Sequence, residues 1–229
     1  MYNRKQYISC NTNTPTSPME SNKVIACYNS TAADYAANLF GELAEKPLDR
    51  LLLKQFAAEN KDKGKMIDLG CGPGQTTRFL AENGVTDTLG TDISSGMISK
   101  AKELNPGLEF QTADILKLPF ADQSFASAVA FYAIVHFTEE QLKIAFAEIH
   151  RVLIPKGQLL ISFHIGEETI HRDELFGIAV DIVFYFFQTE NIIELLTQAK
   201  FRIIDAIERY PYPNVEHPSK RAYLWVEKS

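Results

Sequence analysis

The chain has 229 residues, of which 45% are hydrophobic and 23% are charged, a composition that suits one well-packed globular domain. Its formal net charge of −6 and the lack of a basic run argue against a surface that binds nucleic acid phosphates. No stretch is long and apolar enough to cross a membrane, and the first residues lack the apolar core of a signal peptide. We therefore expect a cytoplasmic protein without membrane insertion.

Cysteine usage gives no sign of a disulfide framework or of a metal centre. The cysteines are Cys10, Cys27 and Cys71, and none forms a CxxC pair or stands at ligand spacing from a histidine. Cys71 lies in a glycine-rich turn, where a small residue fits and no partner for a catalytic thiol is evident. No metal ion is expected.

The N-terminal part of the chain divides into two stretches. Residues 1–22 are rich in Asn, Thr, Ser and Pro, which predicts a disordered leader. Residues 23–229 are predicted to form a single domain, which opens with an N-terminal helical cap over 23–60. Tyr28 and Tyr35 lie on one face of this helical stretch; core packing is one interpretation of the pair, and contact with a ligand is the other.

The most informative segment is Met66 to Thr77, MIDLGCGPGQTT, which predicts a strand, a tight turn and the start of a helix. Gly70, Gly72 and Gly74 permit positive φ angles and let a ligand approach the backbone, and the helix presents free N–H groups to the turn. A dinucleotide fingerprint would need glycine at position 75, where this chain has Gln75. The turn is therefore predicted to bind a nucleotide-type ligand other than NAD.

A second strand is predicted within Thr86–Ile93 and ends at Asp92. The Asp92 carboxylate can accept hydrogen bonds from both hydroxyls of a ribose. A helix N-cap is the alternative role for Asp92, and Ser94 or Ser95 could supply that cap equally well.

A third strand, Leu108–Ala113, is followed by Asp114. The carboxyl ends of parallel strands meet at one edge of a sheet, so Asp68, Asp92 and Asp114 are expected together. Their combined charge suits a cationic ligand better than a pyrophosphate.

These glycines and strand-end carboxylates, in this order, resemble the class I S-adenosylmethionine (AdoMet) methyltransferases of the small-molecule type, over about residues 28–227. The resemblance implies AdoMet as cofactor, with Asp68 near its methionine amino group through water. It places Ile93 and Met97 against the adenine, and Asp114 with the backbone of Ile115 at the adenine edge. The cofactor-binding residues expected are Tyr28, Tyr35, Asp68, Gly70, Cys71, Gly72, Gly74, Asp92, Ile93, Met97, Asp114, Ile115, Phe131 and Tyr132.

A fourth strand, Phe125–Phe131, leads into a segment that ends at His136. In the family this segment passes under the methionine part of the cofactor and faces the substrate, while core packing is the alternative for Phe131 and Tyr132. His136 is the candidate general base because imidazole titrates near neutrality, and a structural histidine bonded to the backbone is the alternative.

The C-terminal half is predicted to complete a doubly wound α/β fold. The expected elements are a helix over Glu139–Leu153, a strand over Gln158–Phe163, a helix over Thr189–Lys200, and strands over Phe201–Glu208 and Arg221–Glu227. The resemblance implies a Rossmann-like seven-stranded sheet in the order 3-2-1-4-5-7-6, with strand 7 antiparallel and helices on both faces.

Residues 164–187 are predicted to form an insertion that covers the substrate. Histidines, carboxylates and aromatics mix in this stretch, so His164 and His171 are candidate substrate contacts, and Tyr212 in the later loop is a third. Solvated charge beside a core strand is the alternative interpretation.

The predicted activity is transfer of a methyl group from AdoMet to a small organic acceptor, which leaves S-adenosylhomocysteine. Two alternatives stay open. The chain could bind AdoMet as a sensor or assembly protein, because every residue assigned with confidence serves the cofactor. A nicotinamide-dependent oxidoreductase is the third candidate, and Gln75 counts against it.

Overall fold

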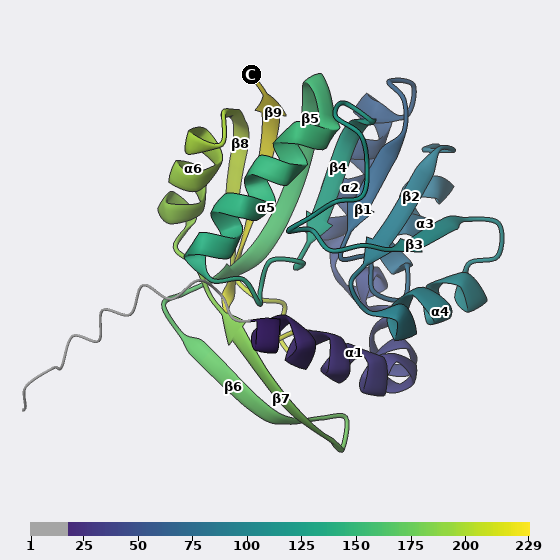
Figure 1. The fold of residues 1–229 in the computed structure, drawn as a ribbon, viewed down its shortest axis with the longest axis vertical. Helices are drawn as coiled ribbons and strands as arrows, with labels where there is room; N and C mark the ends of the chain where they lie inside the picture. The colour runs from purple at the N-terminus through teal and green to yellow at the C-terminus, as the bar shows by residue number, and fades with distance from the viewer. Residues whose placement is uncertain (1–17) are drawn as a thin grey trace, which may run out of the picture.

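The computed structural model describes residues 18–229, and a central seven-stranded sheet organises them (Figure 1). Its strand order is β3-β2-β1-β4-β5-β9-β8, with β9 antiparallel to both of its neighbours. The strands are β1 (Met66–Leu69), β2 (Thr88–Asp92), β3 (Glu109–Thr112), β4 (Phe125–Phe131), β5 (Leu153–Ile165), β6 (Thr169–Leu175), β7 (Ile178–Tyr185), β8 (Phe201–Arg209) and β9 (Lys220–Lys228). The predicted doubly wound fold and its strand order are confirmed, since β9 and β8 take the places expected for strands 7 and 6.

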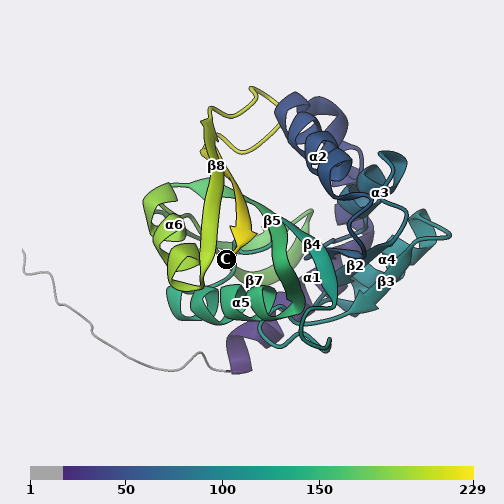
Figure 2. The same cartoon turned by 90° about the horizontal axis from the view of Figure 1, so that it is seen from above.

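Helices cover both faces of the sheet, as the view from above shows (Figure 2). They are α1 (Pro18–Leu39), α2 (Pro47–Asn60), α3 (Gln75–Glu82), α4 (Ser95–Leu104), α5 (Glu139–Val152) and α6 (Thr189–Gln198), with a 3-10 turn, η1 (Glu42–Glu45). Alternate strand residues face opposite layers: Ile67 of β1 packs in the core with α5 and α6, whereas Met66 packs in a second core with α2 and α3. The sheet is buried on both faces, which is why its central strands are continuous hydrophobic runs.

The insertion over 164–187 forms a separate two-stranded antiparallel sheet, the β6–β7 hairpin. In Figure 1 the hairpin extends below the main sheet and lies beside α1. A salt bridge of 2.5 Å between Lys23 of α1 and Asp181 of β7 joins the two. Alternation of half-buried and exposed residues along Ile178–Tyr185 explains the strand, because one face packs on α1 and the other meets solvent.

Two boundaries differ from the expectations by more than two residues. Helix α1 begins at Pro18, within the stretch expected as a leader, and residues 1–17, including Cys10, lie outside the described part. Strand β5 begins at Leu153 rather than at Gln158, because Leu153 already pairs with Phe125 across an irregular step in the register. Both differences lengthen an element and leave the topology unchanged.

Candidate functional site

The β1–α3 turn has the backbone that its glycines permit. The φ angles of Gly70, Gly72 and Gly74 are +67°, +53° and +88°. A Cβ on Gly70 would lie 2.6 Å from the Cβ of Ala133, whereas a Cβ on Gly72 would meet nothing closer than a Tyr35 ring carbon at 3.9 Å. Gly72 therefore leaves open space above the turn, and Gly70 is required by packing against the β4–α5 segment.

Gly74, expected among the cofactor-binding residues, lies outside the cavity lining. It is the N-cap of α3, and a Cβ there would lie 2.7 Å from Asn105 Nδ2 and 2.8 Å from the Phe110 ring. Gly74 is absent from the cavity lining, so its glycine is explained by close packing of α3 against neighbouring chain and not by direct contact with a ligand.

Asp92 lies at the tip of β2, opposite the glycine turn. One carboxylate oxygen accepts a hydrogen bond from Gly72 N at 3.0 Å and the other accepts from Ser94 N at 2.8 Å. Burial raises the pKa of Asp92, and these two N–H donors oppose that shift. The side chain of Ser94 caps α4 by accepting from Met97 N, so the N-cap role considered for Asp92 belongs to Ser94.

The other two strand-end carboxylates behave differently from each other. Asp68 is buried, accepts a hydrogen bond of 2.6 Å from Thr77 Oγ1 and does not line the cavity. Desolvation raises its pKa to about 7, and the Thr77 bond counteracts part of the shift. Asp114 does line the cavity and accepts from Leu116 N at 2.9 Å. The expected approach of Asp68 to the methionine amino group therefore finds no support in its position, which instead ties β1 to α3.

One cavity joins most of the predicted residues. Its empty volume is about 1160 Å³, including the part that opens to solvent. The predicted residues in its wall are Tyr28, Tyr35, Gly70, Cys71, Gly72, Asp92, Ile93, Met97, Asp114, Ile115, Phe131, Tyr132 and His136. Burial raises the pKa of the Cys71 thiol well above its usual value, so Cys71 is a small wall residue and not a nucleophile.

Helix α1 forms the roof of this cavity. Tyr28 and Tyr35 meet edge to face with ring centroids 6.0 Å apart, and both line the wall. Between them in sequence, Asn29 Oδ1 accepts hydrogen bonds from Ser94 Oγ at 2.8 Å and Gly96 N at 2.9 Å. Asn29 thus fastens α1 to the N-terminus of α4, directly after Asp92. Of the two interpretations of the tyrosine pair, the position over a cavity is the one observed.

His136 connects the roof to the hairpin. Its Nδ1 lies 2.6 Å from the carbonyl oxygen of Val183 in β7, and its Nε2 lies 2.7 Å from the Tyr28 hydroxyl. A carbonyl only accepts, so Nδ1 carries the proton and Nε2 accepts the hydrogen bond from Tyr28. Burial lowers the pKa of His136 to about 4, which keeps the ring neutral. The backbone bond considered for this histidine is present, and Nε2 keeps an acceptor lone pair at the cavity wall.

The three substrate candidates do not line the cavity. His171 is on the outer hairpin, largely exposed, and Nε2 contacts Asp181 at 2.8 Å. The Tyr212 hydroxyl accepts from Leu48 N at 3.1 Å and so ties the β8–β9 loop to α2. His164 lies one layer behind the wall, with its ring centroid 5.3 Å from that of Tyr132. Direct substrate contact by His171 and Tyr212 therefore finds no support in their positions.

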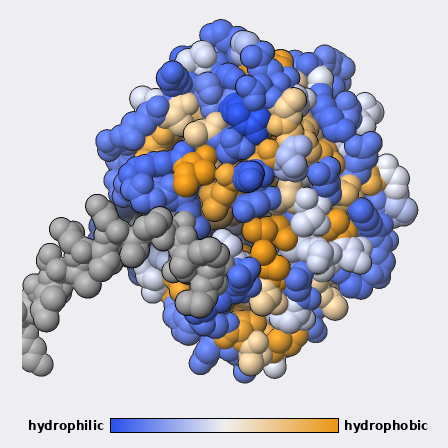
Figure 3. All heavy atoms as spheres, in the orientation of Figure 1, coloured by the Kyte–Doolittle hydropathy of each residue, from blue (hydrophilic) through white to orange (hydrophobic). Residues whose placement is uncertain are grey.

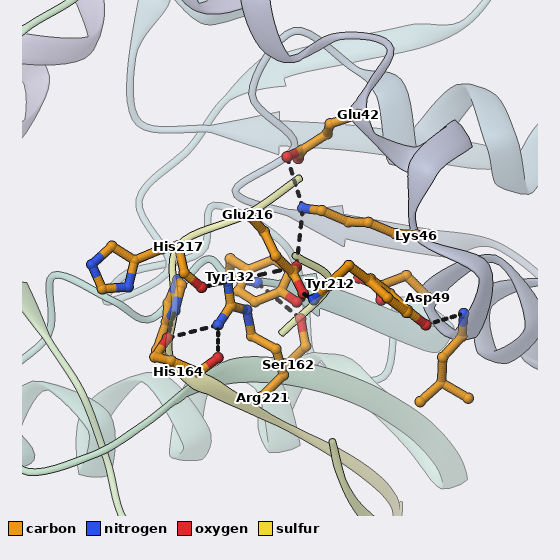
Figure 4. Close-up of polar contacts among 12 residues, drawn as sticks. Glu42, Lys46, Asp49, Tyr132, Ser162, His164, Tyr212, Glu216, His217 and Arg221 are labelled. Atoms are coloured by element: carbon orange, nitrogen blue, oxygen red, sulfur yellow. Dashed lines mark hydrogen bonds and ion pairs between the residues drawn. The ribbon is translucent and has the colours of Figure 1, made fainter. Parts of the chain in front are cut away.

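Behind Tyr132 lies a buried polar cluster that the sequence interpretation missed (Figure 4). Arg209 Nη2 donates to Asp49 Oδ1 at 2.9 Å, and Nη1 of the same guanidinium donates to Glu216. Lys46 Nζ lies 2.7 Å from Glu42, which reaches the cavity wall. The buried polar cluster consists of Glu42, Lys46, Asp49, Tyr132, Ser162, His164, Arg209, Tyr212, Glu216, His217, Ser219, Arg221 and Tyr223.

Several wall residues were also missed. Gln75 was noted only as a departure from the dinucleotide pattern, yet it lines the cavity and its buried Oε1 has no hydrogen-bond partner within residues 18–229. Glu42 of η1 also lines the cavity. Gln75 could have been predicted as a wall residue because it comes directly after the glycine turn. Nothing near Glu42 in the sequence indicates that it lines the cavity.

The part of the chain that the structure describes was searched for a metal site and for a membrane-spanning helix. Within residues 18–229 no three His, Cys, Asp or Glu side chains are grouped so as to hold a metal ion. No helix in the same range has the length and apolar character of a membrane span.

The strand order, the glycine turn and the carboxylate at the tip of β2 define a class I methyltransferase fold. The methyltransferase domain family matches residues 66–157. A probable tRNA methyltransferase 9B of Homo sapiens is 35% identical over 144 residues, which cover 62% of this chain and 29% of that protein. A malonyl-[acyl-carrier protein] O-methyltransferase of Erwinia billingiae is 33% identical over 145 residues, 59% of this chain and 55% of that protein.

Solved structures share the fold. Magnesium protoporphyrin IX methyltransferase from Synechocystis PCC 6803, with bound AdoMet, superimposes with a TM-score of 0.67 at 18% identity, covering 95% of this chain and all of that one. Residues 66–157 therefore match a methyltransferase domain, and the fold of the described chain is that of class I AdoMet-dependent methyltransferases. It spans under a third of the length of the tRNA methyltransferase relatives and about half of the O-methyltransferase relative from Erwinia.

The cavity wall fits AdoMet, the cofactor of this family. The unpartnered Gln75 Oε1 and the Glu42 carboxylate are acceptors, which suit an ammonium group. Asp92 has two carboxylate oxygens with spare lone pairs for ribose hydroxyls, even though each oxygen already accepts one N–H. Met97 and Ile115 supply apolar wall near Asp114, as a purine ring requires.

Proposed function

We propose that this protein transfers the methyl group of AdoMet to a small organic acceptor that enters under α1. The observation that carries the proposal is the continuity of one cavity wall from Asp92 and Asp114 to His136 and Tyr28. The same wall thus joins residues suited to the cofactor with a histidine whose unprotonated Nε2 accepts from the Tyr28 hydroxyl. When bound, AdoMet supplies an electrophilic methyl group on a sulfonium, and its transfer leaves S-adenosylhomocysteine.

Residues at the carboxyl ends of β1 to β3 would hold the cofactor. Asp92 would accept from the ribose hydroxyls, and Gly72 leaves room for the ligand at the turn. Gln75 and Glu42 would accept from the methionine ammonium. Burial under Tyr28 and its neighbours excludes water, and alignment of the acceptor then provides most of the rate enhancement.

His136 would act as proton acceptor for a hydroxyl substrate. A hydroxyl acceptor would replace Tyr28 as the donor to Nε2 and would pass its proton to that nitrogen as its oxygen is methylated. The Val183 carbonyl holds the proton on Nδ1 and thereby keeps the Nε2 lone pair available. A carboxylate substrate would need no base, and His136 would then only orient Tyr28 by accepting from its hydroxyl.

A small acceptor is favoured over a nucleic acid. The net charge is −6, and the face in Figure 3 is largely polar with hydrophobic side chains across its centre. The cavity is also roofed by α1, which limits access for a large substrate. The bovine and human tRNA methyltransferase relatives match this chain over 144 residues, which are 29% of their own length, and their acceptor is not carried over to this chain.

The test is incubation of the protein with methyl-labelled AdoMet and a fractionated extract of small metabolites. The proposal expects label in an acid-stable small-molecule product, and it expects His136→Asn to reduce that label while S-adenosylhomocysteine still binds in calorimetry. Binding without any labelled product would favour the sensor alternative. A thermal shift with NAD and none with AdoMet would favour the oxidoreductase.

A further inference from the structure

The end of β4 and the segment after it form, together with Tyr28 of α1, one part of the cavity wall. This part, the acceptor wall, consists of Tyr28, Phe131, Tyr132, Ala133, His136 and Phe137. Neighbouring rings contact one another: the centroids of Phe131 and Tyr132 are 6.2 Å apart, and those of Tyr28 and His136 are 5.5 Å apart. Because all of these residues except Ala133 carry a ring, a methyl acceptor under α1 meets mainly aromatic faces and edges.

The side-chain N–H and O–H groups of the acceptor wall are already donated within the protein. The Tyr28 hydroxyl donates to His136 Nε2 at 2.7 Å, and His136 Nδ1 donates to the Val183 carbonyl at 2.6 Å. The Tyr132 hydroxyl donates at 3.3 Å to Asp49, which does not line the cavity. These side chains therefore offer a ligand lone pairs and ring faces, and a group that only accepts hydrogen bonds finds no side-chain donor among them.

The charged groups of the cavity wall have one sign. Glu42, Asp92 and Asp114 line the cavity, whereas no lysine or arginine of residues 18–229 does. Lys46 pairs with Glu42 at 2.7 Å, and AdoMet brings one net positive charge, since its sulfonium and ammonium outweigh its carboxylate. One wall carboxylate thus has no positive counterpart when the cofactor is bound. That excess opposes the burial of an anionic acceptor and favours a cation.

The cations nearest to the acceptor wall are kept out of the cavity. Lys46 Nζ and Arg221 Cζ lie 5.3 Å and 5.9 Å from the Tyr132 ring centroid, and neither residue lines the cavity (Figure 4). Glu42 and Glu216 already pair with them. An anionic acceptor would therefore find no positive side chain in the wall to replace its lost hydration.

We propose that the methyl acceptor is a primary or secondary amine on an apolar body; this rests on the proposed methyl transfer. An ammonium group has donors and no acceptor, and it is attracted by ring faces. It therefore matches a wall of rings and lone pairs with an excess of negative charge. The hydroxyl oxygen of Tyr28, whose own proton is held by His136, can accept an N–H from the amine.

The amine loses one proton before it is methylated. The ammonium gives that proton to water at the open end of the cavity, and the remaining N–H groups keep the nitrogen on Tyr28. The nitrogen lone pair then attacks the methyl carbon, so that the C–N bond forms and the C–S bond breaks with its electron pair on sulfur. A methylammonium product and S-adenosylhomocysteine result. His136, with a pKa of about 4, is not needed as a base for this attack and orients Tyr28.

The first experiment determines the charge of the methylated product. The protein is incubated with methyl-labelled AdoMet and a metabolite extract, and the products are extracted into organic solvent at pH 10 and at pH 2. The label should be extracted at pH 10 alone, because an amine loses its charge only at high pH. A labelled product with any other partition would overturn the amine assignment and leave methyl transfer standing. Binding of AdoMet without labelled product would instead overturn the proposed function.

The second experiment compares matched probes that differ in one group. Ligand-observed NMR on the S-adenosylhomocysteine-saturated protein measures phenethylamine against phenethyl alcohol and hydrocinnamate, and tryptamine against tryptophol and indolepropionate. At least one amine should bind about tenfold more tightly than its matched acid, because ring faces and the unneutralised carboxylate favour the cation. The absence of a preference in both sets, or a preference for the acids, would contradict the assignment.

A new positive charge in the wall tests the electrostatic part of the proposal. Val24 lines the cavity four residues before Tyr28, on the same face of α1, so Val24→Lys adds an ammonium beside the acceptor wall. The preference for amine over acid should fall at least about tenfold in Val24→Lys and should persist in the neutral variant Val24→Met. Leu51→Lys, at a site that is 62% exposed, is the control for net charge. Circular dichroism and S-adenosylhomocysteine affinity establish that each variant is folded. A preference that is unchanged in Val24→Lys would contradict the proposal.

Discussion

The site has two halves that are built in different ways: the cavity wall around the glycine turn, and the polar cluster behind Tyr132, most of which does not line the cavity. At the ends of β1 and β2 the wall consists of turns whose backbone N–H groups bind side chains close in the sequence. Gly72 N, for example, donates to the carboxylate of Asp92, which is 20 residues away. Behind β4 and β5 the contacts are between side chains far apart in sequence: Asp49 meets Arg209 across 160 residues and Tyr223 across 174. The first half depends on local backbone geometry, and the second depends on the complete fold.

That difference explains how far the sequence could be interpreted. Glycines at alternate positions and a carboxylate at a strand end are local patterns with a direct physical meaning, and so the turn and the place of Asp92 were predictable. The strand order was predicted from the family resemblance that these patterns carry. Lys46, Arg209 and Arg221 look like ordinary surface charges in the sequence. Only the assembled sheet shows that Lys46 and Arg221 are buried and that the Arg209 side chain is 9% exposed.

His136 falls between these two cases. Its place after β4 was predictable, but its tautomer depends on a carbonyl of β7, 47 residues away. The hairpin itself was expected only as an insertion, because exposed charge on β6 conceals the strand pattern. The position of His171 on the outer hairpin could not be derived either, since nothing in the sequence says which face of the hairpin packs against α1.

The largest effect should come from the side-chain half. Arg209→Met would leave the buried carboxylates of Asp49 and Glu216 without their guanidinium, and breaking a buried ion pair costs about 3–5 kcal/mol. Arg202→Met removes an exposed pair on the same strand and should cost about 1 kcal/mol or less. Urea unfolding measures both. Equal losses in the two variants would remove the contrast between the halves.

Next is the glycine turn. Gly72→Val combines a strained φ with a side chain in the open space above the turn, and should weaken S-adenosylhomocysteine binding at least ~100-fold, or about 2.7 kcal/mol. Gly107→Ala is the control, because its φ of +96° is also unfavourable for a side chain and it is absent from the cavity lining. Calorimetry on both folded variants decides; unchanged affinity in Gly72→Val would exclude the turn from the cofactor site.

The pH dependence of stability tests the burial of His136. Its pKa is 6.5 when unfolded and about 4 when folded, so between these values the unfolded chain binds more protons and stability falls as the pH falls. From pH 7 to pH 5 the loss of stability amounts to about 2 kcal/mol, because pH 5 lies 1.5 pH units below the unfolded pKa of 6.5 and each unit corresponds to about 1.36 kcal/mol. His136→Gln should lack this increment in denaturant titrations at the two pH values. Parallel losses in both proteins would mean that His136 titrates normally.

A smaller effect is expected at Asp92. Asp92→Ala removes an acceptor for the ribose hydroxyls and should weaken S-adenosylhomocysteine binding about tenfold. This corresponds to the lower end of the energy range for a hydrogen bond to a charged group. Asp87→Ala, on the exposed approach to β2, is the control. A 2′-deoxy analogue should bind the wild type more weakly and the Asp92→Ala variant without further loss. If the analogue binds the wild type as well as the parent ligand, Asp92 does not hold the ribose.

The central claim is that the cofactor binds in the cavity between the glycine turn and the α1 roof, so that one ligand orders both. Hydrogen exchange with and without S-adenosylhomocysteine measures this directly, because amides that become buried or held exchange more slowly. The account predicts added protection at residues 70–74 and also at 24–36 of α1, where Tyr28 and Tyr35 line the wall. Protection confined to the turn, with α1 unchanged, would contradict it.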